Sequence, residues 1–464
     1  MRVLASLVSL FALGVCAVAV ALWCSPVPVV DWISNPEASW KLAQGENPAP
    51  VQLVRPAAAP LSAMAQLGKL VFYDTSLSSS GKLACESCHS PQHAYGPPGD
   101  DPAVYGGPAL ASQGARAVPS LMYLDREPNF SIGPDPSGDN DALLPLPQRA
   151  AQARNTSRVT KTARDTAQAA ANIVPQGGMF WDGRADTLQI QAMGPLLNPL
   201  EMDGGSIQIV AAKLQAAPYA NRFAQLFGAQ IFAAPGMLVS EAMFAVARYQ
   251  IEDQSFHPYS SKYDAWLEGK ARLTQAELRG YVLFNDPKKG DCAACHVDQA
   301  SPDGLPPLFT DHQFEALGLP RNPKLVVNQA ANYFDLGLCG PGRTDLEKQT
   351  QYCGMFLTPT LRNAATRKVF FHNGVYHNLQ DVLDFYDFRD TRPEKIYPRG
   401  ADGQIEKFND LPKPYQANID VSDPPLDRKL GQAPALSHGE EKDIIAFLKT
   451  LTDGYVPPGG KPAA

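Results

Sequence analysis

Two short segments of the chain place a pair of cysteines directly before a histidine. They read CESCH at 85–89 and CAACH at 292–296. In this spacing two thiols can bond to the vinyl groups of a haem, and the histidine then becomes the proximal ligand of its iron. A zinc site or a disulfide pair is the alternative, but zinc ribbons space such pairs about 15 to 20 residues apart. The sequence therefore predicts two covalently bound c-type haems, on Cys85, Cys88 and His89 and on Cys292, Cys295 and His296.

A longer sequence segment also occurs twice, with substitutions. FWDGRADTLQIQAMGP at 180–195 aligns with FHNGVYHNLQDVLDFY at 371–386 and shares a phenylalanine, a glycine and a Leu-Gln pair with it. The segments 67–89 and 279–296, which lead into the two CxxCH motifs, align as well. Each half thus contains the same two aligned segments in the same order. This pattern indicates a duplicated unit, and so two similar domains rather than a solenoid.

The last residue of this repeated segment differs between the two copies. Pro195 ends the first copy, and Tyr386 ends the second. The sixth position on the iron distinguishes a haem that only carries electrons from one that reacts. A phenolate can ligate iron and a proline cannot, so one haem would be closed and the other open. Tyr386 also fits a plain core position, because it continues the helical spacing of Leu379 and Leu383.

The elements that would carry these residues are mainly helical. Apolar residues recur at three- and four-residue spacing in 206–214, 237–251, 274–284, 378–385 and 437–451. Ser437 and Glu440 form a capping box at the start of the last segment. The stretch 123–178 is polar, rich in Pro, Gly and Asp, and lacks periodicity, as in a long loop. We expect an all-α fold of two haem domains with long loops.

The N-terminus and the overall charge indicate the compartment and the partners. Residues 3–24 are almost unbroken apolar sequence after Arg2, which fits an export signal or a retained membrane anchor, and both remain open. The stretch 25–60 is expected to be a linker, because 41–60 is rich in Pro and Ala and has little periodicity. A formal net charge of −7 argues against nucleic acid as a partner. In an oxidising compartment, the leftover Cys339 and Cys353 favour a disulfide over free thiols.

Five longer segments form a specific set. They are VFYDTSLSSSGKLACESCH (71–89), GARAVPS (114–120), FWDGRADTLQIQAMGPLLNPLEM (180–202), FTDHQFEALGLP (309–320) and TPTLRNAATRKVFFHNG (358–374). In this order they resemble the motifs of the di-haem cytochrome c peroxidases and MauG-type enzymes. The resemblance implies two cytochrome c-like domains: an N-terminal peroxidatic haem domain at 61–255, with an insertion at 123–178, and a C-terminal electron-transfer haem domain at 256–464.

The resemblance also implies roles for single residues. Glu201 corresponds to the distal acid–base carboxylate, and Gln191 and Pro195 correspond to the other residues of the distal pocket. Trp181 corresponds to the residue between the two haems. Tyr386 corresponds to the axial ligand of the second haem, which is methionine in ordinary peroxidases and tyrosine in the MauG-type branch.

Two departures from the family pattern matter. Members that need reductive activation carry a distal histidine shortly before the GARAVPS segment, and 106–114 contains no histidine. We therefore expect the first haem to be open in the resting protein. The family's calcium-binding asparagine falls at Ala117, and its carbonyl donors fall at Arg367 and Val369, which puts an inter-haem calcium in doubt.

These observations lead to an expected function. We expect a periplasmic di-haem peroxidase that reduces hydrogen peroxide at the His89 haem and shares the oxidising equivalents with the His296 and Tyr386 haem. Its electron donor would be a small redox protein, and residues 3–24 could hold it at the inner membrane. Two alternatives stay open: a MauG-like maturase that oxidises an aromatic residue of a partner protein, and a non-catalytic di-haem electron-transfer cytochrome.

Overall fold

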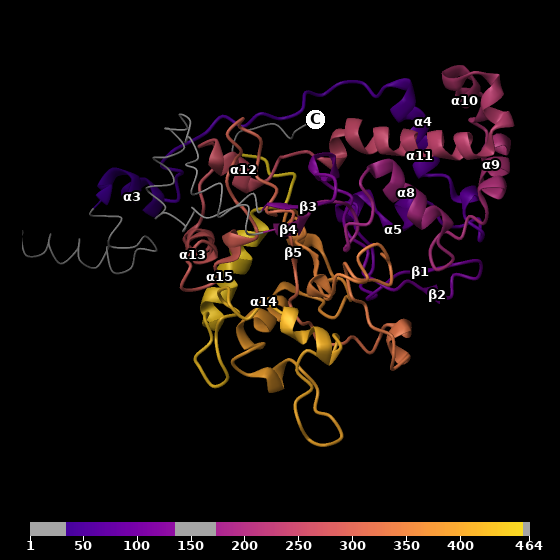
Figure 1. Cartoon of the computed structure of the whole chain (residues 1–464). Coiled ribbons are helices and arrows are strands. Elements are labelled where there is room, and N and C mark those ends of the chain that lie inside the picture. Colours follow the sequence, from indigo (N-terminus) through magenta and orange to yellow (C-terminus); the bar gives the residue numbers. More distant parts are fainter. Residues whose placement is uncertain (1–33, 135–172, 458–464) are drawn as a thin grey trace, which may run out of the picture.

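The computed structural model describes residues 34–134 and 173–457 (Figure 1). The predicted export signal and most of the predicted insertion lie outside this range. The described part is rich in helices, as predicted, and also contains three two-stranded antiparallel sheets that the all-α prediction omitted. The sheets pair β1 (Tyr105–Gly106) with β2 (Ser112–Gln113), β3 (Ser131–Pro134) with β4 (Ile173–Gln176), and β5 (Phe314–Glu315) with β6 (Phe356–Leu357). No helix within the described ranges is long and apolar enough to cross a membrane.

The N-terminal half is assembled around one long helix, α11 (Pro235–Glu252). Helix α11 packs against α4 (Ala63–Phe72), α8 (Leu188–Leu197) and α9 (Ile207–Ala216), and α10 (Ala220–Phe227) lies beside α4 and α9 (Figure 1). Side chains of Ser62, Thr187 and Ser206 cap the first turns of α4, α8 and α9. The buried faces of these helices form one apolar core.

The C-terminal half has an apolar core of its own, built from other helices. Helix α13 (Gln275–Phe284) packs against α15 (His438–Lys449), and α12 (Lys262–Leu267) and α14 (Leu379–Phe388) contribute to the same core. The capping box of Ser437 and Glu440 is confirmed at the start of α15. All five predicted helical segments are present, as α9, α11, α13, α14 and α15.

The predicted linker is wrong in part. It contains α3 (Pro36–Ala43), whose Leu42 is buried in the C-terminal core. Trp266 Nε1 donates to the carbonyl oxygen of Gly45 at 2.9 Å, and the amide of Val51 donates to Leu267 at 2.9 Å. Proline and alanine in this stretch were read as spacer sequence, although they are compatible with a helix that starts at a proline.

Short elements connect these helices. They are α5 (Cys85–Cys88) and the 3₁₀ turns η1 (Thr75–Leu77), η2 (Pro91–His93), η3 (Leu124–Arg126), η4 (Ala229–Ala233), η5 (Gln254–Phe256), η6 (Cys292–Ala294), η7 (Val326–Gln329), η8 (Thr350–Tyr352), η9 (Ala364–Thr366), η10 (Pro393–Lys395) and η11 (Lys413–Asn418). Both CxxCH motifs lie on such short elements, α5 and η6. Their cysteines are therefore positioned by the surrounding core and not by a long helix.

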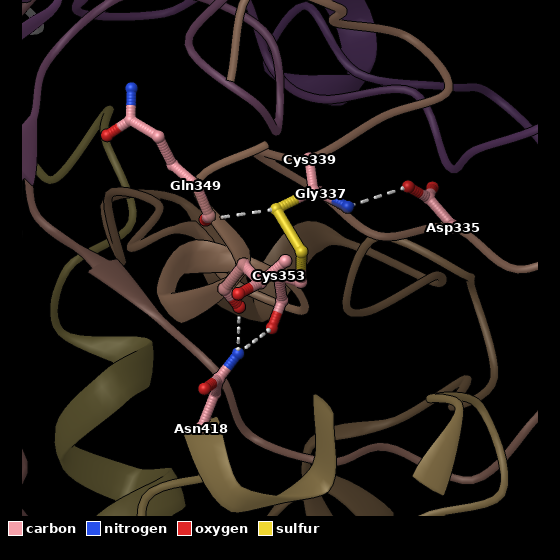
Figure 2. The surroundings of a disulfide bond; sticks show 7 residues. Asp335, Gly337, Cys339, Gln349, Cys353 and Asn418 are labelled. Atoms are coloured by element: carbon pink, nitrogen blue, oxygen red, sulfur yellow. Dashed lines mark hydrogen bonds between the residues drawn. A yellow bond between two sulfur atoms is a disulfide. The ribbon is translucent and has the colours of Figure 1, made fainter. Parts of the chain in front are cut away.

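A disulfide joins Cys339 to Cys353, as predicted, with their Cα atoms 4.9 Å apart (Figure 2). Asn418 Nδ2 donates to the carbonyl oxygen of Cys353 at 3.0 Å and so ties the cross-linked loop to η11. At the start of the loop, the amide of Gly337 donates to Asp335 Oδ1 at 3.1 Å. The disulfide thus closes a loop that begins next to the Asp335 carboxylate.

In each half, one glycine lets two helices approach backbone to backbone. A Cβ at Gly68 of α4 would lie 1.8 Å from the carbonyl oxygen of Ala245 in α11. A Cβ at Gly280 of α13 would lie 1.9 Å from the carbonyl oxygen of Asp443 in α15. Contacts this short are impossible for any other residue, so both helix pairs depend on these glycines.

Substitution of Gly68 tests this packing. Gly68→Ala should lower the free energy of unfolding by about 1 to 3 kcal/mol or more, because the methyl group overlaps backbone that cannot rotate away. Gly236→Ala on α11 is the control, because its Cβ would meet nothing within 4 Å. The control should change stability by less than about 1 kcal/mol. Urea unfolding followed by circular dichroism measures both, and equal midpoints would contradict the packing argument.

Candidate active site

A cavity of about 390 Å³ lies in the N-terminal half. It brings together residues far apart in the sequence, from α5, from the turn before α8 and from the two ends of α8. Every residue that the sequence assigned to the first haem or its distal pocket lines this cavity: Cys85, Cys88, His89, Trp181, Gln191, Pro195 and Glu201. The predicted site is therefore one continuous space.

His89 is held by a strained turn. Its Nδ1 lies 3.1 Å from the carbonyl oxygen of Tyr95, which accepts its hydrogen. Ala94 and Tyr95 both have positive φ, of 52° and 50°, a conformation that side chains other than glycine rarely adopt. Burial lowers the pKa of His89 to about 4, so the imidazole is neutral at physiological pH. A neutral imidazole whose Nδ1 is held by a carbonyl presents Nε2 as a metal ligand.

A second cavity, of about 220 Å³, lies in the C-terminal half and is lined by Cys292, Cys295, His296 and Tyr386. The histidine is held as in the first cavity. His296 Nδ1 lies 2.9 Å from the carbonyl oxygen of Phe309, which has a φ of 57°. Burial lowers the pKa of His296 to about 4. Each cavity thus holds a CxxCH motif with a neutral histidine, which fits a covalently bound haem.

Tyr386 extends from α14, which begins at the Asn378 cap. Burial is the main cause of the raised pKa of Tyr386, and Arg389 acts in the opposite direction. A bound iron would take the place of the phenol proton. The position is therefore compatible with a phenolate ligand once haem is attached.

Trp181 lines both cavities. Its indole Nε1 donates to the carbonyl oxygen of Ala117 at 2.8 Å, and its own carbonyl oxygen accepts from the amide of Leu357 at 2.9 Å. The indole is therefore fixed between a strand of the C-terminal half and a loop of the first cavity. This is the place that the sequence predicted for it.

The wall beside Trp181 contains an ion-pair network. The sequence offered the Arg184–Asp182 pair as one of two possibilities but did not predict the links made by Arg116. Arg116 donates to Asp182 Oδ2 at 2.7 Å and to both oxygens of Asp335, at 2.6 and 2.7 Å. Arg184 donates to the other oxygen of Asp182, also at 2.7 Å, and its guanidinium stacks on Phe180. Arg116 was visible in the GARAVPS segment, but Asp335, 219 residues away, carries no local signal.

Glu201 is the carboxyl group of the first cavity. Its Oε1 accepts from Asn198 Nδ2 at 2.6 Å. Burial raises the pKa of Glu201, while the charge of Arg184 and the Asn198 hydrogen bond oppose the rise. A carboxyl group whose pKa lies above its ordinary value takes up a proton more readily and is suited to acid–base exchange. Gln191, on the same helix as Pro195, is buried beside it.

His372 is a further residue of the second cavity. Its ring stacks on Phe356 with centroids 3.5 Å apart, and its Nε2 lies 3.7 Å from Asp410 Oδ2. Within the described residues this nitrogen has no hydrogen-bond partner, although it is buried. The sequence motif contained this histidine but gave it no role.

The region that the sequence connected with calcium contains a buried cation. The Arg367 guanidinium donates to the carbonyl oxygens of Val118 at 2.8 Å and Val369 at 3.3 Å. Burial lowers the pKa of Arg367 to about 10. The Val369 carbonyl, which the family pattern assigns to calcium, thus accepts a hydrogen bond from an arginine of this chain, and the doubt about an inter-haem calcium stays a prediction.

Comparisons with known proteins agree with this geometry. A family model described as "Di-haem cytochrome c peroxidase" matches residues 62–272. The methylamine utilization protein MauG of Paracoccus denitrificans is 31% identical over 406 residues, 85% of this chain and 90% of that protein. Cytochrome c551 peroxidase of Nitrosomonas europaea is 28% identical over 74% of this chain and 77% of its own length. The crystal structure of the diheme peroxidase BthA of Burkholderia thailandensis has 32% identity and a TM-score of 0.72, covering 89% of this chain and 93% of its own.

Removal of Arg116 tests the network beside Trp181. Arg116→Met should destabilise the protein by about 3 to 5 kcal/mol at neutral pH, because Asp335 is left buried and unpaired. Arg116 holds the pKa of Asp335 below its usual range, against the opposing effect of burial. This pairing therefore stabilises the fold above the unfolded-state pKa and is lost as the pH falls through the lower folded-state pKa.

The stability difference between wild type and Arg116→Met should therefore shrink from about pH 7 to about pH 4, as the unpaired Asp335 of the variant takes up a proton. Urea unfolding at both pH values measures it. Arg399→Met, at an exposed arginine, is the control and should show little change at either pH. A pH-independent difference would mean that Arg116 acts through packing alone.

Proposed function

The chain belongs to the family of di-haem cytochrome c peroxidases and MauG, oxidoreductases that act on peroxide, and on this premise we propose that it reduces hydrogen peroxide in the first cavity. The observation that carries the proposal is the composition of that cavity. It combines a CxxCH motif, a carboxyl group with a raised pKa, and a proline where the second cavity has a tyrosine. In this proposal Cys85 and Cys88 attach the haem and His89 ligates its iron from one side.

A bound haem supplies the redox chemistry of peroxide reduction, and the chain supplies proton transfer and orientation. One oxygen of hydrogen peroxide must lose a proton, and the leaving oxygen must gain one. Glu201 can do both, because it lies in the cavity and burial raises its pKa, so the carboxyl group holds a proton more readily than an exposed one. Asn198 holds Oε1, which leaves Oε2 for this exchange. Pro195 cannot ligate iron and keeps the peroxide side open.

The second cavity is proposed to hold an electron-transfer haem. Cys292 and Cys295 would attach it, and His296 and Tyr386 would be its axial ligands. An anionic phenolate stabilises oxidised iron more than a neutral thioether does, so this haem would store oxidising equivalents. Trp181, with its extended π system and its contact with both cavities, is the proposed relay between them.

We propose that the two halves, 61–255 and 256–464, arose by duplication. Matching backbone details support this. Gly68 and Gly280 each let two helices pack closely. Tyr95 and Phe309 each have a positive φ, and the backbone carbonyl of each accepts a hydrogen bond from a histidine. Phe180 and Phe371, which begin the two copies of the repeated segment, have φ angles of 68° and 62°.

The wider setting is proposed from the sequence and the relatives. The apolar residues 3–24 and the disulfide support export to the periplasm, where a small redox protein would be the electron donor. The 31% identity to MauG also supports the second candidate function, oxidation of an aromatic residue on a partner protein. Both functions start with peroxide in the first cavity, and they differ in what reduces the enzyme afterwards.

The first test is addition of hydrogen peroxide to the resting diferric protein. Because 106–114 contains no histidine to close the first haem, the spectrum should change without prior reduction. Stopped-flow spectroscopy at matched haem concentration, with and without one-electron pre-reduction, measures this. A reaction seen only after pre-reduction would contradict the open first site.

Substitution of Glu201 tests the proton exchange. Glu201→Gln keeps the size of the side chain and removes the exchangeable proton, so peroxide turnover should fall by about 100- to 10,000-fold. Haem content and resting spectra should stay unchanged. Glu241→Gln, on α11 and outside the cavity lining, is the matched control. Turnover within a few-fold of wild type in Glu201→Gln would exclude Glu201 as the acid–base group.

Substitution of Tyr386 tests the second ligand. Tyr386→Met should raise the reduction potential of one haem, because a neutral thioether favours ferrous iron relative to a phenolate. Peroxide should still react, since the first cavity is untouched. A spectroelectrochemical titration measures the potential, with Tyr376→Phe, outside the cavity lining, as control. An unchanged potential would mean that Tyr386 is a packing residue.

A further inference from the structure

Three tyrosines behind the first cavity, Tyr95, Tyr249 and Tyr73, form a row around the ring of Phe72. The Tyr249 side chain lies between the other two and interacts electrostatically with both. Tyr95 and Tyr249 are 2% and 1% exposed, and Tyr73 is 39% exposed. The row therefore runs from the buried core to solvent.

The row begins at the wall of the first cavity. Phe72 lines that cavity, and its ring centroid lies 6.3 Å from Tyr95, 5.5 Å from Tyr249 and 5.3 Å from Tyr73. The backbone of Tyr95 also accepts the hydrogen bond of His89. An oxidising equivalent in the cavity is thus one aromatic ring or one hydrogen bond away from Tyr95.

The buried end of the row has a defined proton acceptor. The hydroxyl oxygens of Tyr95 and Ser255 lie 2.5 Å apart, and Ser255 donates its own hydrogen to Asp253 Oδ1 at 2.7 Å. Tyr95 is therefore the donor to Ser255. Burial raises the pKa of Tyr95 and of Tyr249, so both are protonated phenols at neutral pH. A phenol can be oxidised at moderate potential only if its proton leaves with the electron, and this contact provides for that.

The C-terminal half lacks the corresponding hydroxyls. Under the proposed duplication, Phe309 corresponds to Tyr95, and it lies 6.3 Å from Phe284 as Tyr95 does from Phe72. In the same way Phe447 corresponds to Tyr249, and Asn285 corresponds to Tyr73. Packing at these three positions therefore does not require tyrosines. Their presence beside the peroxide cavity needs another reason.

We propose that Tyr95, Tyr249 and Tyr73 conduct oxidising equivalents from the first haem site to the protein surface. Tyr73 is then a second oxidation site, for one-electron reductants that are too large to enter the cavity, such as an aromatic side chain of another protein or a bulky phenol. This inference rests on the proposed peroxide reaction.

Each transfer moves one electron together with one proton. Tyr95 gives one electron to the peroxide-oxidised haem and its phenolic proton to Ser255, which passes its own proton to Asp253. Tyr249 then returns one electron and one proton to Tyr95, and Tyr73 does the same for Tyr249. The neutral radical ends on Tyr73 and takes one electron and one proton from the external reductant. Asp253 returns its proton to solvent.

Radical trapping in the haem-loaded protein tests the proposal. Peroxide is added without a donor, in the presence of a nitroso spin trap, and the adduct is located by peptide mass spectrometry. Freeze-quenched samples grown on ring-deuterated tyrosine are compared by electron paramagnetic resonance. We expect an adduct on Tyr73 and a radical signal that narrows with the deuterated ring.

Single substitutions identify the route. Tyr95→Phe and Tyr249→Phe install the residues that the C-terminal half already has, so the fold should persist. Each should abolish the Tyr73 adduct. In Tyr249→Phe, which leaves the turn that holds His89 untouched, the haem spectrum should still change on addition of peroxide. Ser255→Ala should reduce the adduct yield by removing the proton acceptor. Tyr415→Phe, in the C-terminal half, is the control and should leave the yield unchanged.

The outcomes separate this inference from the proposed function. A protein whose haem spectrum does not respond to peroxide would contradict the proposed function. A normal spectral response with no adduct on Tyr73, or with an adduct that persists in both Tyr95→Phe and Tyr249→Phe, would overturn the tyrosine route alone.

Discussion

Both cavities depend on one hydrogen bond, from the Nδ1 of a histidine to the carbonyl oxygen of an aromatic residue with positive φ. Such a backbone conformation costs on the order of 1 to 3 kcal/mol for a residue with a side chain, and it persists only where the surroundings impose it. Here the surroundings are the aromatic cores, since Tyr95 stacks on Phe256 and Phe309 packs against Tyr263. Ring burial thus stabilises the turn, and the turn fixes the imidazole.

Local patterns in the sequence were enough to predict the main helices and the CxxCH motifs. Segments such as α13 and α15 carry both their apolar period and their capping residues within a few positions, so their existence follows from nearby residues. Glu201 and Gln191 could be assigned only through resemblance to a family, because their spacing alone reveals no chemistry. Pro195 was indicated as well by its place opposite Tyr386 in the repeated segment.

Interactions between distant segments escaped sequence reasoning. Arg116 and Asp335 are an ordinary arginine and aspartate until the fold places them 2.6 Å apart. The small sheets are equally hidden, since strands of two to four residues are too short to show an alternating pattern. The stretch 41–60 was predicted to be a linker from its composition, which cannot distinguish a spacer from a segment that docks through Leu42 and Gly45. In each case the deciding information is a partner elsewhere in the chain.

The disulfide of Figure 2 places a demand on how the protein matures. Cys339 and Cys353 must be oxidised to close their loop, whereas haem attachment in this proposal requires Cys85, Cys88, Cys292 and Cys295 as reduced thiols. A thiolate attacks any disulfide it can reach, so the six cysteines that follow residue 24 can pair wrongly in an unfolded chain. During maturation one polypeptide therefore has to contain both oxidised and reduced cysteines. The order of haem insertion and oxidative folding then affects the yield of active protein.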